Sequence, residues 1–231
     1  MIGAVAPAPA ENPSFSVCLR GACGGFGIAL ATSRSNGGSL VPFASRTGAI
    51  AALGFAASKL GSDALGLLEW GLPVERAIAS VLGRDPDAQR RQLHGVDATG
   101  MHAFTGAETL PLAGHLTGDG ISIAGNKLPD LARLEAMLRV AEATREMELG
   151  ERLLLVLEAG RNRDAGPEGQ QSAALLAASP QPRLHHNLRV DDHADPIREL
   201  RRLYEVMRVQ ADEIRTMHGE RAFRAISRVR T

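Results

Sequence analysis

The sequence lacks the features that mark several classes of protein. Its two cysteines, Cys18 and Cys23, fit neither a zinc-binding set nor a redox CxxC pair, so we expect two buried free thiols, the alternative being a disulfide in an oxidising compartment. The 26 basic and 26 acidic residues cancel, so the charge balance indicates neither a nucleic-acid nor a membrane-surface partner. No apolar run approaches the roughly 18 residues of a membrane span, and the first ten residues do not resemble a secretory signal. We therefore predict a cytoplasmic protein that handles a small molecule or another protein.

Common catalytic motifs are also missing. The chain contains no P-loop, no G-x-S-x-G nucleophile elbow and no H-E-x-x-H zinc motif. The glycines at positions 21, 24, 25 and 27 do not form G-x-G-x-x-G, and the seven histidines are scattered. The sequence therefore predicts neither a metal site nor a bound cofactor.

Aromatic residues make up only 3% of the chain, so the core must be built from Ala, Leu, Val and Ile, which suits two tightly packed sheets. Residues 14–20 alternate between apolar and polar side chains, and with the glycine-rich residues 21–25 and the apolar 26–33 they predict a hairpin. We expect further strands and helices, in the following ranges: strands at 40–44, 48–55, 91–97, 101–105, 121–126, 171–179 and 186–191; helices at 60–68, 73–82, 128–145, 149–159 and from 196 onward.

In this order, helices come in pairs between blocks of hairpin strands. That arrangement argues against a doubly wound parallel sheet and favours an α+β fold with antiparallel sheets covered by helices. Residues 1–13 are small and contain proline, so we expect a flexible arm, followed by one domain over 14–217. Residues 218–231 carry several arginines and are expected to be a basic tail.

Six segments, read in order from residue 14 to about residue 203, resemble the bacterial domain of unknown function 1028, a family assigned to the N-terminal-nucleophile (Ntn) hydrolases. The segments are SFSV, ALATSRS, VPFASRTGAIA, VDATGMHAFTGAETLPLAGHLTGDGISIAGN, EGQQSAALL and LRVDDHADPIRELRRL. The resemblance implies a four-layer αββα sandwich of two stacked, mainly antiparallel sheets. It also implies an amide-bond hydrolase acting on a small metabolite, and we expect a homo-oligomer.

In an Ntn hydrolase the first residue of the mature chain is the nucleophile and its own α-amine is the base. The resemblance assigns this role to Ser14, where family members commonly have Thr directly after the initiator Met. Here thirteen residues precede it, so an active enzyme requires either removal of the arm between Pro13 and Ser14 or a start codon further downstream. The alternative is a non-catalytic binding or assembly protein that retains the pocket.

Other candidates follow from the same resemblance. We expect Ser33 to lie near the nucleophile as a catalytic group, and Asn126 to be an oxyanion donor or, alternatively, a helix cap before Leu128 and Pro129. Substrate binding is predicted for the remaining candidates, which are Ser16, Arg34, Gln171, Ser172, Asp191 and His193. For Ser16 and Arg34 the competing interpretations are ordinary strand and surface residues. For Asp191 and His193 the alternative is helix-entry architecture, because Asp195 and Pro196 form a helix-start signature.

Overall fold

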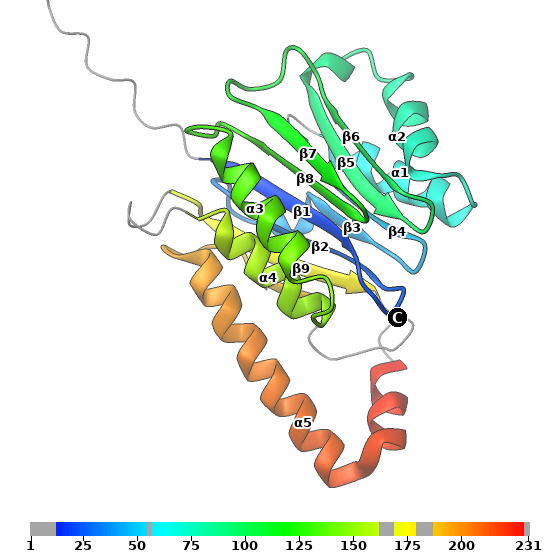
Figure 1. Cartoon of the computed structure of the whole chain (residues 1–231), viewed down its shortest axis with the longest axis vertical. Helices are drawn as coiled ribbons and strands as arrows, with labels where there is room; N and C mark the ends of the chain where they lie inside the picture. Colours follow the sequence, from blue (N-terminus) through cyan, green and yellow to red (C-terminus); the bar gives the residue numbers. More distant parts are fainter. Residues whose placement is uncertain (1–12, 55–56, 162–168, 179–186, 229–231) are drawn as a thin grey trace, which may run out of the picture.

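A computed structural model describes residues 13–54, 57–161, 169–178 and 187–228 (Figure 1). The predicted arm, apart from Pro13, lies outside these residues. The strands are β1 (Ser14–Arg20), β2 (Phe26–Thr32), β3 (Pro42–Ala44), β4 (Gly48–Gly54), β5 (Arg91–Asp97), β6 (Met101–Thr105), β7 (Gly114–Gly118), β8 (Ile121–Asn126), β9 (Ser172–Ala178) and β10 (Asn187–Val190). The helices are α1 (Ser58–Glu69), α2 (Val74–Leu82), α3 (Ala132–Ala143), α4 (Leu149–Ala159) and α5 (Pro196–Arg228).

The strands form two antiparallel sheets that face each other. One has the order β10-β9-β2-β1-β8-β7 and the other the order β3-β4-β5-β6. Helices α3 and α4 cover the outer face of the six-stranded sheet, whereas α1 and α2 cover that of the four-stranded sheet (Figure 1). Helix α5 packs against β9 and β10 and then extends away from the body (Figure 1). The fold is therefore mixed α and β with antiparallel sheets, as expected.

The alternation in β1 determines which layer each side chain enters. Successive side chains of a strand point to opposite faces. Phe15, Val17 and Leu19 belong to the apolar cluster under α3, α4 and α5, whereas Cys18 belongs to the cluster between the two sheets. The layer between the sheets is built largely from small or β-branched residues, which are Cys18, Ile28, Ala49, Ala51, Val96 and Ala124 together with Phe26 and Leu53. Small side chains in this layer let the two backbones approach closely.

A buried histidine bridges the two sheets within this layer. His94 on β5 is fully buried, and its Nε2 lies 2.7 Å from the Ser16 Oγ of β1. Its Nδ1 lies 3.2 Å from the Ser122 Oγ of β8. Burial lowers the pKa of His94 to about 3, so the imidazole is neutral at pH 7. Each of its two nitrogens has a hydroxyl partner.

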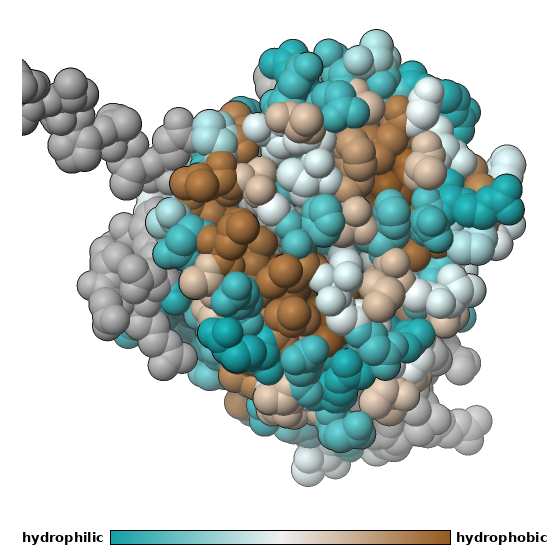
Figure 2. All heavy atoms as spheres, turned by 45° about the horizontal axis from the view of Figure 1, so that its top comes forward, coloured by the Kyte–Doolittle hydropathy of each residue, from teal (hydrophilic) through white to brown (hydrophobic). Residues whose placement is uncertain are grey.

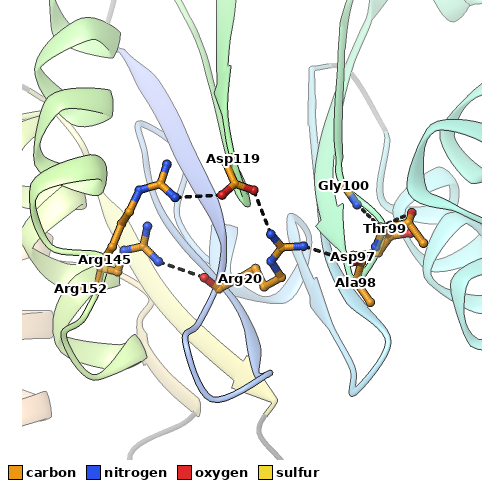
Figure 3. A network of polar contacts seen from close by, with 8 residues as sticks. All are labelled: Arg20, Asp97, Ala98, Thr99, Gly100, Asp119, Arg145 and Arg152. Carbon is orange, nitrogen blue, oxygen red and sulfur yellow. Dashed lines mark hydrogen bonds and ion pairs between the residues drawn. The ribbon is translucent and has the colours of Figure 1, made fainter.

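A second set of polar contacts joins the sheets and helices at the opposite end of β1 (Figure 3). Asp119 accepts from Arg20 at 2.9 Å and from Arg145 at 3.0 Å, while Arg20 also donates to the Ala98 carbonyl. Arg152 is almost fully buried and donates to two backbone carbonyls, those of Arg20 and Ala141. These contacts link β1 to the β5–β6 turn on one side and to α3 and α4 on the other.

Three local expectations were wrong, for identifiable reasons. Strand β7 was not predicted, because in the sequence GHLTG only Leu116 is a large apolar residue and the strand is at the edge of its sheet. The helix expected over 128–145 begins at Ala132, since Lys127 has a φ of 53° and Pro129 follows it closely. Cys23 is exposed in the β1–β2 turn, whereas Cys18 is buried as expected.

The predicted tail over 218–231 overlaps the end of α5, which bends at Gly219, where φ is 74°. Residues 229–231 lie outside the described part. Within the described part, no helix combines the length and the apolar character needed to span a bilayer.

Figure 2 shows apolar side chains gathered in a band across the face that it presents. Large apolar side chains that the described residues leave exposed include Leu110, Leu112 and Leu131, as well as Trp70 on the α1 side. Bands of this kind are typical of protein–protein contacts. The predicted homo-oligomer stays a prediction.

Replacement of the bridging histidine tests the packing between the sheets. Between about pH 6.5 and pH 3 the unfolded chain binds a proton at His94 that the folded chain does not bind. The free energy of unfolding should therefore fall with decreasing pH, by about 1.4 kcal/mol per pH unit from this residue at most. We expect His94→Gln to flatten that slope in urea titrations between about pH 7 and pH 4. His218→Gln, on the exposed part of α5, is the control. An unchanged slope in His94→Gln would contradict the assignment of this pH dependence to His94.

Candidate functional site

Four polar side chains form a row at the end of the six-stranded sheet where β1 begins. Ser172 of β9 is the register partner of Thr32 on β2, and Ser14 of β1 is the partner of Asn126 on β8. The Ser14 Oγ lies 2.8 Å from the Thr32 Oγ1, which joins the two pairs. Strand alternation directs Ser14 to the same side as Ser16, toward the four-stranded sheet. We call Ser172, Thr32, Ser14 and Asn126 the polar row.

The polar row is nearly closed to solvent. Relative exposure is 9% for Ser14, 7% for Thr32, 3% for Asn126 and zero for Ser172. Buried hydroxyl and amide groups are costly unless they are hydrogen-bonded, and their hydrogen bonds are stronger than those made in water. Each member of the row has a hydrogen-bond partner within the protein. The row therefore forms a preorganised polar site, with Ser14 as its most exposed member.

Thr32 is the closest neighbour of the Ser14 hydroxyl. Its Oγ1 accepts from the backbone N–H of Arg34 at 3.3 Å, and its carbonyl accepts from the N–H of Gln171 at 2.7 Å. These contacts fix both the backbone and the side chain of Thr32. Thr32 thus holds the Ser14 Oγ in one place, a role that the sequence reasoning missed although Thr32 lies directly before the candidate Ser33.

Asn126 is held from the opposite sheet. Its Nδ2 donates to the Gln92 Oε1 at 3.0 Å. A side-chain amide carries two N–H donors, and this contact uses one of them. The helix-cap alternative for Asn126 is wrong, because the N-cap of α3 is Leu131 and Asn126 is the last residue of β8.

The loop after β2 is attached to the polar row. The Ser172 Oγ donates to the Arg34 carbonyl at 2.6 Å and accepts from the Gly37 N–H at 3.0 Å. Ser33 is half-buried and Arg34 is exposed, so both lie at the rim and not within the row. The Arg34 guanidinium forms no ion pair with another described residue, which leaves its charge available at this rim.

Gln171, Asp191 and His193 lie on the same side as this loop, and of the three His193 contacts the start of α5. The backbone N–H of His193 donates to the Gln171 carbonyl, and the His193 Nδ1 accepts from the Asp195 N–H at 2.9 Å. The Asp191 carboxylate pairs with Arg189 at 2.9 Å. The Gln171 Nε2 donates to the Asp192 carboxylate at 3.0 Å. This geometry favours the helix-entry alternative for His193, whereas Asp191 pairs with Arg189 of β10.

The remaining candidate, Ser16, lies on the face shared with Ser14 but bonds to His94 instead of the candidate nucleophile. Elsewhere, a hollow between α4 and α5 is lined by Glu148, Tyr204, Arg208 and their neighbours, and contains no member of the polar row. In the part of the chain that the structure describes, no three His, Cys, Asp or Glu residues are grouped to hold a metal ion.

Comparison with known proteins identifies relatives of the chain but no characterised activity. The model of a family of unknown function (DUF1028) matches residues 14–200, which include the whole polar row and begin at Ser14. The crystal structure of protein SPO2555 from Silicibacter pomeroyi, assigned to the same family model, is 32% identical, with a TM-score of 0.75 over 84% of this chain and 85% of that chain. No curated protein matches this sequence.

A glycine substitution tests the packing around the polar row. A Cβ at Gly37 would overlap the Thr32 Cγ2 and lie 2.9 Å from the Ser172 Oγ. We expect Gly37→Ala to lower the free energy of unfolding by about 1–3 kcal/mol, as overpacking does. Gly66→Ala in α1, where nothing lies within 4 Å, is the matched control and should stabilise by up to about 1 kcal/mol. Chemical denaturation of both variants provides the comparison, and equal effects would contradict the tight packing.

Proposed function

This chain belongs to the family of unknown function DUF1028, and on that premise we propose that it is an amide-bond hydrolase of the N-terminal-nucleophile type acting on a small metabolite. The observation that carries the proposal is the position of Ser14. It is the first residue of β1, its Oγ lies 2.8 Å from the Thr32 Oγ1, and its register partner is Asn126. A hydroxyl with a hydrogen-bond partner and an amide beside it suits acyl transfer.

The proposed chemistry begins with cleavage of the bond between Pro13 and Ser14, which frees the α-amine of Ser14. A free α-amine has a pKa of about 7.7–8.0, so a useful fraction is neutral near pH 7. The amine takes the proton of the Ser14 hydroxyl as the Oγ attacks the substrate carbonyl carbon. The same proton then passes to the leaving amine, and water hydrolyses the resulting ester to release the acid and restore Ser14.

The neighbours of Ser14 have separate roles in this proposal. The Thr32 hydroxyl orients the Ser14 Oγ, and the second N–H of the Asn126 amide stabilises the tetrahedral oxyanion. Arg34 lies at the rim and forms no ion pair with the residues that the structure describes, so it suits a substrate carboxylate. Ser33 lies at the same rim. Ser172, within the polar row, holds the loop after β2, and the Gln171 N–H holds the Thr32 carbonyl.

The fold supports this proposal. Two facing antiparallel sheets with helices on both outer faces are the arrangement that an Ntn-type αββα sandwich requires. Ser14, the proposed nucleophile, is the first residue of β1, a central strand of the six-stranded sheet. The cytoplasmic location and the homo-oligomer predicted from the sequence are parts of the same proposal.

The second candidate function is an Ntn-fold binding or assembly protein without catalysis. The observation that favours it is that Pro13 precedes Ser14 and is buried. While Pro13 is attached, the nitrogen of Ser14 is an amide, which cannot accept the hydroxyl proton. Catalysis by the proposed mechanism is then unavailable even though the polar row is formed.

Acylation of Ser14 separates the two functions. We expect protein beginning at Ser14 to form an acetyl adduct with 4-nitrophenyl acetate, and Ser14→Ala to lower the rate by at least about 10³-fold, because it removes the nucleophile. Intact mass and N-terminal sequencing locate the adduct and the mature terminus. Ser45→Ala in the β3–β4 turn is the control. Equal acylation of a chain that retains residues 1–13 would defeat the mechanism, and no acylation of either chain would favour the binding protein.

A further inference from the structure

We propose that Gln92, on the sheet opposite Ser14, is a positioning residue that fixes the orientation of the Asn126 amide toward the reacting carbonyl. The inference rests on the proposed function, since it concerns the oxyanion donor of that reaction. Gln92 is on β5, the second strand from the edge of the four-stranded sheet, and its side chain is fully buried. No motif in the sequence indicated it.

The hydrogen bonds of Gln92 determine which end of its own amide faces Asn126. The Gln92 Nε2 lies 3.0 Å from the Gly125 carbonyl oxygen, 3.0 Å from the Gly114 carbonyl oxygen and 3.1 Å from the Thr105 Oγ1. Carbonyl oxygens only accept, so the group that faces them must be the NH₂ of Gln92. The Gln92 Oε1 is therefore the acceptor, and it faces Asn126.

The orientation of Asn126 follows from that of Gln92. Because the Gln92 Oε1 only accepts, Asn126 must present its NH₂ to it, as the 3.0 Å contact shows. One N–H of Asn126 is thereby engaged and the direction of the second is fixed. Without Gln92 the two orientations of the Asn126 amide, which differ by exchange of oxygen and nitrogen, are no longer distinguished by this contact.

The carbonyls that orient Gln92 belong to the same part of the sheet as the site. Gly114 and Gly125 are register partners on β7 and β8, and Gly125 directly precedes Asn126. A Cβ at Gly125 would lie 3.0 Å from the Ser14 carbonyl oxygen, so this backbone is close to the strand of the nucleophile. Gln92 of the four-stranded sheet thus donates to the backbone of β8 and, through its Oε1, orients the Asn126 side chain on the same strand.

A purely structural role is the competing explanation, because His94 forms a similar bridge between the sheets two residues further along β5. The two roles differ in whether the effect of replacing Gln92 depends on Asn126. A structural bridge contributes to stability independently of Asn126, whereas a positioning residue loses its effect on the reaction once Asn126 is gone. A double-mutant cycle measures this coupling.

The experiment uses protein that begins at Ser14 and follows its complete turnover of 4-nitrophenyl acetate to acetate and 4-nitrophenol. We expect Gln92→Met to lower kcat about 10- to 100-fold with KM changed less than about twofold, since the donor acts in the transition state. We expect the pair Gln92→Met and Asn126→Ala to cost no more than Asn126→Ala alone. The control is Ser122→Ala. Ser122 lies on β8, as Asn126 does, but its hydroxyl contacts His94, so its effect should combine additively with that of Asn126→Ala.

Side-chain amide signals in ¹H–¹⁵N NMR spectra provide a readout that does not depend on activity. We expect the Asn126 NH₂ signals to exchange slowly with solvent in the parent protein and faster in Gln92→Met. If Gln92→Met does not fold, Gln92→Glu replaces it. Its carboxylate still accepts from Asn126 but cannot donate to the two carbonyls, so we expect its kcat to fall less than that of Asn126→Ala, and an equal fall would overturn the positioning role.

The outcomes of these measurements are distinct. A normal kcat in Gln92→Met, or additive effects of Gln92→Met and Asn126→Ala, would overturn the positioning role while the hydrolase proposal stands. Unchanged Asn126 exchange in Gln92→Met would overturn it as well. Undiminished acetylation of Ser14→Ala would defeat the hydrolase proposal, and the exchange measurement would then still decide whether Gln92 orients Asn126.

Discussion

The close contact between the two sheets is the constraint on which the rest of the structure depends. The layer between them is made largely of small side chains, and two polar residues of β5, Gln92 and His94, reach across it. Each must satisfy its hydrogen bonds there, because a buried polar group without a partner costs about 1–3 kcal/mol. Both do so with groups on β1, β7 or β8. The register of one sheet against the other is thereby specified.

The two ends of β1 have different characters as a result. At its start, the polar row and the buried Gln92 create a nearly dry site in which hydroxyls and amides are held by fixed partners. At its end, Arg20 joins the ion pairs around Asp119, which are partly exposed and screened by water (Figure 3). Only the start offers the low-dielectric, preorganised surroundings that acyl transfer uses. The proposed chemistry is therefore assigned to Ser14 and not to the ion pairs around Asp119.

Family membership and site geometry contribute different parts of the argument. The relationship to DUF1028 and to the protein from Silicibacter pomeroyi establishes a shared fold and a family without an assigned function. A fold does not determine an activity. The functional proposal therefore depends on four groups, which are Ser14, Thr32, Asn126 and Gln92, and on the state of the nitrogen of Ser14.

The sequence by itself determined the elements whose signal is local. Alternation in residues 14–20 placed Ser14 at the start of a strand with two different faces, and glycine and proline marked the ends of α2 and the start of α5. Local patterns could not reveal β7, whose weakly apolar sequence pairs only because β8 supplies its partner. Nor could they reveal Thr32 and Gln92, which are 18 and 78 residues from Ser14 in the chain. Their roles arise from strand pairing and from stacking of the sheets, and such long-range contacts are decided only when the whole chain packs.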